Sequence, residues 1–188
     1  MKAIKFVLVL SAFLAFLLVS CSDESQSPVS PAVQGSLEKV NPPIDFTAED
    51  YPLNFLDPGV MKTEEGEKII LHGLVAHERF ESSNTLLNGE MENTVNFVFD
   101  KRTGEGEVYG QLTLHPYDVP DGVWDANWHG KNVKTGASEW THYLNVLGHG
   151  KGGAIDGMKF TGTVVIVENQ VPSLDWHGYI SDGKIYSH

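Results

Sequence analysis

The feature that most constrains the fold is the lack of helical periodicity after Glu67. The chain instead shows short runs rich in Val, Ile, Thr and aromatic residues, separated by Gly, Asn and Asp. Regularly spaced runs of this kind are typical of β-sandwiches and β-barrels. We predict strands at 67–80, 91–99, 106–115, 122–132, 138–148, 158–168 and 174–182, with an eighth near 37–47. The segment "FDKRTGEG" predicts a tight hairpin that uses Gly104 at positive φ, and residues 51–59 are expected to form a loop.

Alternation along these runs separates an apolar face from a polar one, because successive side chains of a strand point to opposite faces. In 122–130 one face carries Trp124, Ala126 and Trp128, and the other carries Asp125, Asn127 and His129. We expect two apolar sets in the core: Val95, Phe97 and Phe99, and Val108, Leu112 and Leu114. Which of the two faces would line a barrel is left open by the alternation.

The N-terminal segment has the pattern of an export signal. Lys2 and Lys5 precede an apolar run over 6–19. A membrane-spanning helix needs about 20 apolar residues, so this run fits the core of a signal peptide instead. Its end, "LVSC", resembles the bacterial lipoprotein signal, in which the cysteine is acylated and becomes the first mature residue. This resemblance implies that Cys21 is a palmitate-type membrane anchor; a cleaved secretory signal with an incidental cysteine is the alternative.

The residues after Cys21 imply a location and an organisation. "SDES" resembles the export tag that sends some Gram-negative lipoproteins to the outer face of the cell, so we expect a lipid-anchored, surface-exposed protein of the outer membrane. The following segment is rich in Ser, Pro, Val and Gln and has the composition of a linker. We therefore divide the chain into a signal peptide (1–20), a disordered linker (21–45) and a β-domain (46–188).

Charge and cysteine content exclude several classes of function. Without residues 1–20 the chain has 11 Lys and Arg against 25 Asp and Glu, a net charge of −14. This balance argues against nucleic acid binding, which needs basic patches. Cys21 is the only cysteine, so a disulfide and a thiolate zinc site are both excluded within the chain. The oligomeric state is left open.

Three segments resemble a known family of barrels. These are the hairpin "VNFVFD…TGEGEVYG", the strand "GVWDANWHG" and the stretch "LGHGKGGAIDGMKFTGTV". In this order they resemble the small eight-stranded barrels of the allene oxide cyclase and dirigent type, over residues 90–168. The resemblance implies an all-β fold: a single small, antiparallel, calycin-like barrel of about eight strands.

Two motifs that suggest cofactors have plainer interpretations. "GHGKGG" satisfies the dinucleotide pattern G-x-G-x-x-G, but that pattern requires a helix immediately after it. The residues that follow are β-branched and interrupted by glycine, so a turn is the better interpretation. No H-x-H or H-E-x-x-H pattern occurs, and a metal site would have to be assembled from separate strands. We therefore expect no cofactor and no local metal site.

The candidate functional residues allow two kinds of protein. The first is a lyase or dehydratase acting on a polyhydroxylated compound such as an oligosaccharide, since elimination needs no nucleophile motif and no redox cofactor. In this hypothesis His129 or His142 is the base, Tyr143 or Tyr109 the acid, and Asp125 orients a histidine. Arg79 would clamp a carboxylate. The remaining substrate-binding candidates are His77, Asn127, Trp128 and Trp140. The second kind is a barrel that binds a glycan or a lipophilic ligand without turnover.

Overall fold

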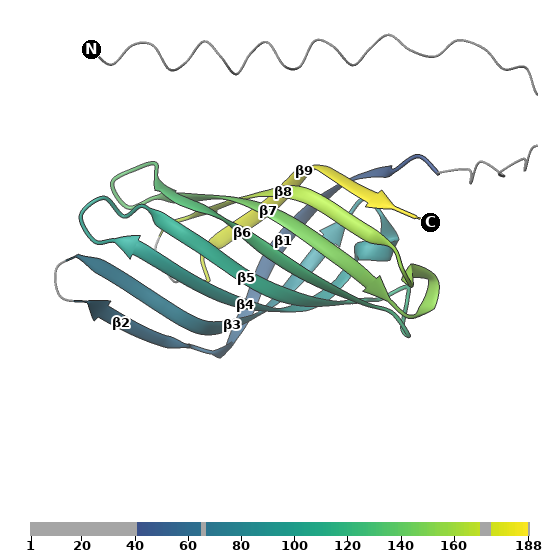
Figure 1. The fold of residues 1–188 in the computed structure, drawn as a ribbon, viewed down its shortest axis with the longest axis horizontal. Coiled ribbons are helices and arrows are strands. Elements are labelled where there is room, and N and C mark those ends of the chain that lie inside the picture. The colour runs from purple at the N-terminus through teal and green to yellow at the C-terminus, as the bar shows by residue number, and fades with distance from the viewer. Residues whose placement is uncertain (1–40, 65–66, 170–173, 188) are drawn as a thin grey trace, which may run out of the picture. The chain divides into compact units, whose positions relative to one another are not determined.

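The computed structural model describes residues 41–64, 67–169 and 174–187, and within these ranges most residues belong to β-strands (Figure 1). The strands are β1 (Ile44–Asp57), β2 (Val60–Glu64), β3 (Lys68–Ser82), β4 (Gly89–Asp100), β5 (Gly106–Pro116), β6 (Val123–Lys134), β7 (Trp140–Lys151), β8 (Lys159–Glu168) and β9 (Trp176–Tyr186). Two short 3₁₀ turns, η1 (Thr85–Leu87) and η2 (Gly153–Ile155), lie between β3 and β4 and between β7 and β8.

The sheet closes into an antiparallel barrel of eight strands. From β3 to β9 each strand pairs with the next along the chain, and β1 pairs with both β9 and β3. β2 pairs with β3 alone, at one end of the molecule (Figure 1). Closure removes the free strand edges on which open sheets aggregate. The prediction of a single closed antiparallel barrel is therefore confirmed.

The stagger of the strands sets the width of this barrel. A path that starts at Phe99 and steps from each residue to its register partner on the next strand returns to β4 at Gly89, ten residues before its start. The residues along this path are Gly106, Asn132, His142, Ile166, Gly178, Asp50 and Phe80. Strand number and stagger together fix strand tilt and barrel width. Eight strands leave an interior that side chains can fill or that can hold one small ligand.

Seven predicted strands are confirmed to within a few residues at each end, and the Gly104 turn is confirmed by its φ of 73°. The eighth strand was placed too early. The prediction of a loop over 51–59 is wrong for most of that segment, because β1 runs to Asp57 and pairs with β3 as far as Val75. Two register shifts in the pairing of β1 with β3, at 52–54 and 55–57, accommodate its irregular sequence, including Pro52.

One end of the barrel is closed by side chains from the loops between strands. Leu87 of η1, Val119 of the β5–β6 loop and Ile155 of η2 are all buried there. Below them Trp124 is fully buried, and its indole Nε1 donates a hydrogen bond to the Leu86 carbonyl at 2.9 Å. The "GHGKGG" segment belongs to this end: it finishes β7 and turns at Gly152 and Gly153, both at positive φ, with no α-helix after it.

The apolar faces of β4, β5 and β6 point into the barrel. Trp124, Ala126 and Trp128 are buried, as are Phe97, Phe99, Val108 and Leu114, whereas Val95 and Leu112 are partly buried against this core. The core prediction is thus confirmed, and the polar face of 122–130 lies on the outside. In the part of the chain that is described, no helix is long and apolar enough to cross a membrane.

Candidate ligand cavity in the barrel lumen

A cavity of about 100 Å³ occupies the half of the lumen away from the closed end. Its walls come from all eight barrel strands and are mainly aliphatic and aromatic. Towards the open end they include the half-buried Phe55 and Trp176. The volume is enough for several water molecules or a small organic ligand. The polar or ionisable side chains of the wall are Asp50, Glu78, Asn93, Trp128, His142, Glu168 and Trp176.

Two carboxyl groups lie close together in this wall. Asp50 is 5% exposed and Glu78 is fully buried. Pro52 is the register partner of Glu78, so Asp50 and Glu78 are diagonal neighbours on the paired strands β1 and β3. Burial raises the pKa of Asp50 well above its ordinary value. Burial also raises the pKa of Glu78, with a further contribution from the neighbouring Asp50.

Glu78 is held in place by a series of hydrogen bonds that links β3 to β4 and β6. The amide Nδ2 of Asn93 lies 3.1 Å from each carboxyl oxygen of Glu78, to which it donates. The Oδ1 of Asn93 in turn accepts a hydrogen bond from Nε1 of Trp128 at 2.8 Å. Gly110 leaves room for this indole, because a Cβ there would lie 2.4 Å from Trp128. The orientation of Asn93 is therefore fixed, with its amide nitrogen towards Glu78.

The second polar pair of the lumen is formed by His142 and Glu168. Nε2 of His142 lies 2.5 Å from Oε1 of Glu168, and both side chains are less than one-tenth exposed. The pair joins β7 to β8 and lines the same cavity as Asp50 and Glu78. An imidazole whose one nitrogen is held by a carboxylate has its ring orientation fixed, as a general base or a ligand-binding group requires.

Five other candidates on β5, β6 and β7 face outward: Tyr109, Asp125, Asn127, His129 and Tyr143. Tyr109 and His129 are register partners and exposed, Asn127 is exposed beside them, and Tyr143 is 50% exposed. Asp125 binds Lys151 at 2.6 Å and accepts a hydrogen bond from Thr113. The Lys151 ammonium is the main cause that lowers the pKa of Asp125. These residues therefore share the outer surface of the barrel, whereas His142 lies inside the lumen.

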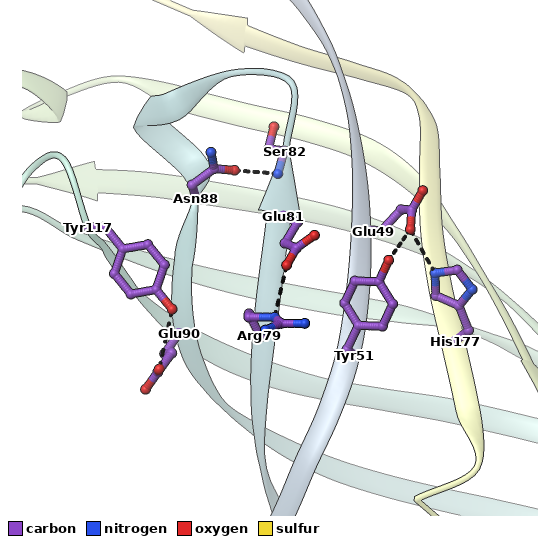
Figure 2. Close-up of polar contacts among 9 residues, drawn as sticks. All are labelled: Glu49, Tyr51, Arg79, Glu81, Ser82, Asn88, Glu90, Tyr117 and His177. Atoms are coloured by element: carbon purple, nitrogen blue, oxygen red, sulfur yellow. Dashed lines mark hydrogen bonds and ion pairs between the residues drawn. The ribbon is translucent and has the colours of Figure 1, made fainter.

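Arg79 and His77 also lie outside the lumen. Figure 2 shows Arg79 directed along the outer face of β3 towards Glu81, with 3.0 Å between Nε and the carboxylate. Its guanidinium lies 5.5 Å from the centre of the Tyr51 ring, which stacks on His177. His77 contacts Asn54 and Glu90 at 3.2 and 3.0 Å.

Acidic partners on this outer face satisfy the polar groups that surround Arg79. Glu49 accepts a hydrogen bond from the Tyr51 hydroxyl and contacts His177, and Glu90 accepts one from Tyr117 (Figure 2). The hydrogen bond from Tyr51 is the main cause that lowers the pKa of Glu49. Arg79 is therefore part of a surface network of ion pairs and stacked rings.

The remaining predicted residues have separate places. Trp128 lines the cavity, whereas Trp140 covers the β4–β5 turn, where its Nε1 would lie 2.6 Å from a Cβ at Gly104. Cys21 lies outside the described residues, as do the predicted signal peptide and most of the predicted linker. Among the residues that are described, no group of three or more His, Cys, Asp or Glu side chains is arranged to hold a metal ion.

Four lumenal residues with carboxyl or amide side chains were not predicted from the sequence: Asp50, Glu78, Asn93 and Glu168. Each carries a readable signal, because each lies two residues from apolar side chains of the inward face. Glu78 follows Leu74 and Ala76 in this alternation, and Asn93 lies between Met91 and Val95. Burying a polar group is costly unless it is hydrogen-bonded, so polar residues at inward positions indicate a structural or binding role.

Comparison with known proteins adds no relative: no protein family, no curated protein and no solved structure matches this chain. The resemblance to allene oxide cyclase and dirigent barrels stays an interpretation of the three sequence motifs. The function must therefore be argued from the lumen itself.

Proposed function

We propose that this barrel binds a small, largely apolar molecule in its lumen. The observation that carries the proposal is the cavity: about 100 Å³ of space remains in one half of a barrel whose other half is tightly filled. Protein interiors are normally close-packed, and unfilled space of this size loses van der Waals contacts and costs stability. A ligand that filled it would recover those contacts.

The chemistry of the walls favours a lipophilic ligand over a polyhydroxylated one. Most of the lining side chains are aliphatic or aromatic, and the polar groups are few and grouped. Binding sites for small molecules commonly combine an apolar wall with a few well-placed polar groups. A sugar would leave most of its hydroxyl groups without hydrogen-bond partners against such a wall, which is unfavourable. Of the two functions expected from the sequence, we therefore favour ligand binding.

The two ends of the barrel support entry from one side. Leu87, Val119 and Ile155 fill the closed end, whereas the opposite end has the partly exposed aromatic rings of Phe55 and Trp176 beside the cavity. We propose that the ligand enters past these two rings. The outer-membrane location expected from Cys21 would expose this entrance to molecules outside the cell.

A titration with phenethyl alcohol, a small neutral aromatic compound, tests the proposal. Saturation-transfer NMR is expected to show binding to the wild-type protein and none to Val164→Phe, because Val164 lines the cavity and the larger ring would fill it. Val165→Phe is the matched control: residue 165 is the next in β8 and is not part of the cavity wall. Circular dichroism must show that both variants are folded. Equal binding by Val164→Phe and wild type would contradict a lumenal site.

Elimination catalysis is the second candidate function, and the contact between His142 and Glu168 favours it. His142 would be the base that removes a proton next to a carbonyl group, and Glu168 would hold its ring. Incubation with a β-hydroxy ketone of similar size, followed by mass spectrometry, tests this function. Loss of one water by the substrate with the wild type but not with His142→Gln would support catalysis. Binding of the ketone without any mass change would leave the barrel a binding protein.

A further inference from the structure

The ionisable side chains that line the cavity are mainly acidic. Its titratable side chains are Asp50 on β1, Glu78 on β3, His142 on β7 and Glu168 on β8, and no Lys or Arg is among the residues that line it. Glu168 is in contact with His142. Asp50 and Glu78 are thus two neighbouring acids without a basic partner among the described residues of the wall.

Asp50 has an unused hydrogen-bonding atom in this setting. Within the described part of the chain its Oδ1 is buried and has no hydrogen-bond partner. The whole residue is only 5% exposed and lines the cavity. A buried polar atom without a partner is costly, and native proteins rarely keep one without a role. This atom is therefore available to a ligand in the lumen.

Glu78 is arranged as an acceptor beside it. The Asn93 amide nitrogen, held by Trp128, donates towards both Glu78 oxygens. An ionised carboxylate accepts such hydrogen bonds more strongly than a protonated one. The chain from Trp128 to Glu78 therefore favours negative charge at a site where burial alone opposes it, and a cation would remove that conflict.

The rest of the wall suits the body of an organic cation. Trp128, Phe97, Phe55 and Trp176 are lining residues, so four aromatic rings belong to the same cavity as the two acids. Aromatic faces attract ammonium groups and also pack well against apolar carbon chains. An inorganic cation would use the acids but not the apolar wall.

We propose that the ligand of the lumen is a small organic ammonium ion whose charged nitrogen is bound by Asp50 and Glu78. This inference rests on the proposed function, since it names the chemical class of the ligand for the same cavity. Burial raises the pKa values of both acids, whereas a bound ammonium group favours their ionised forms, so complex formation promotes the release of protons from them. The affinity should accordingly increase as the pH rises, as long as the amine itself remains protonated.

Calorimetric titration with three compounds of one shape tests the charge: phenethylamine (a cation), phenethyl alcohol (neutral) and phenylacetate (an anion). At about pH 8 we expect phenethylamine to bind at least ~10-fold more tightly than the alcohol, a difference of ~1.4 kcal/mol, and phenylacetate to bind most weakly. The preference for the amine should shrink at about pH 5, where protons compete with it for the two acids.

Variants of the two acids provide the second arm. Asp50→Asn and Glu78→Gln are expected to remove the preference for the amine and to keep or improve binding of the alcohol. Asp125→Asn is the matched control, because this acid lies on the outer face and binds Lys151. Using both lumenal variants keeps the test available if one of them fails to fold.

The outcomes separate the two proposals. If the alcohol and the amine bind equally well and Val164→Phe abolishes both, the lumen is a binding site but the ammonium inference is wrong. A preference for the amine that persists in both Asp50→Asn and Glu78→Gln also overturns the inference. If none of the three compounds binds to the wild type, both the ammonium inference and the proposed function are wrong.

Discussion

Trp128 and Asn93 are joined inside the barrel by a hydrogen bond of 2.8 Å from the indole Nε1 to the amide Oδ1. The two residues are far apart in sequence and lie on β6 and β4, which are separated by β5. This contact decides which way the Asn93 amide points, and so directs its nitrogen to Glu78. A single aromatic donor thereby organises the polar part of an otherwise apolar lumen.

Trp128→Phe is expected to lower the free energy of unfolding by about 1–3 kcal/mol beyond the loss of packing, because it leaves the buried Asn93 Oδ1 without a donor. Urea denaturation of Trp128→Phe, Asn93→Leu and the double variant measures the coupling. The effects should be clearly non-additive, since the two residues share one hydrogen bond. Additivity to within about 0.3 kcal/mol would show that the bond contributes nothing to stability.

The buried acids should make the protein less stable as the pH rises above about 4. Because the pKa values of Asp50 and Glu78 are raised in the folded state, the native protein holds protons that the unfolded chain has already lost. The two acids contribute their full stabilisation at pH values below their pKa in the unfolded chain. This stabilisation is lost as the pH rises through their pKa in the folded protein. Thermal denaturation at a series of pH values should show this decline in the wild type.

The variants that test this pH dependence are expected to change stability in different pH ranges. The double variant Asp50→Asn, Glu78→Gln should flatten the decline above about pH 4. Asp125→Asn should leave it unchanged, because the lowered pKa of Asp125 contributes stability that is lost only as the pH falls below about 4. A decline that survives the double variant would mean that other groups cause it.

The inward face of β4 should not tolerate charge. Phe97 is 2% exposed and stacks on Phe99, with ring centres 4.1 Å apart. Phe97→Asp buries a carboxylate without a partner and should cost more than about 4 kcal/mol, enough to prevent folding. Val98→Asp, one residue further on the opposite face, should cost about 1 kcal/mol or less. Similar loss of folded protein in both variants by circular dichroism would contradict the assigned faces.

Acylation of Cys21 stays a prediction from the sequence. Cells that express the wild-type protein should incorporate a palmitate analogue into it, and cells that express Cys21→Ala should not. Equal labelling of the two proteins would rule out a lipid anchor at this residue. Protease treatment of intact cells then distinguishes display on the outer surface from attachment to the inner leaflet.

The sequence predicted the barrel well because the signals for strands are local. Alternation of apolar residues and glycine-containing turns marked seven strands, and the core residues Phe97 and Val108 followed from the same pattern. The strand β1 was placed too early, and its second half was taken for a loop, because Pro52 and the aromatic residues around it are typical of a loop. Its formation depends on pairing with β3 and β9, which are distant in sequence.

The lumen was harder to predict, because alternation defines two faces without saying which one encloses a ligand. The face with His129, Asn127 and Asp125 is rich in polar groups for the ordinary reason that it meets solvent. Asp50 and Glu78 were the more informative residues, since each interrupts an apolar face. Their proximity arises only when β1 closes the barrel against β3.

The most direct test of a lumenal binding site is the position of a bound molecule. Intermolecular nuclear Overhauser effects between phenethyl alcohol and the methyl groups of the protein provide it. We expect contacts to the methyl groups of Leu144, Val146 and Val164, which line the cavity. Contacts confined to outward methyl groups such as those of Val165 and Leu147, with none to the lining residues, would contradict the account.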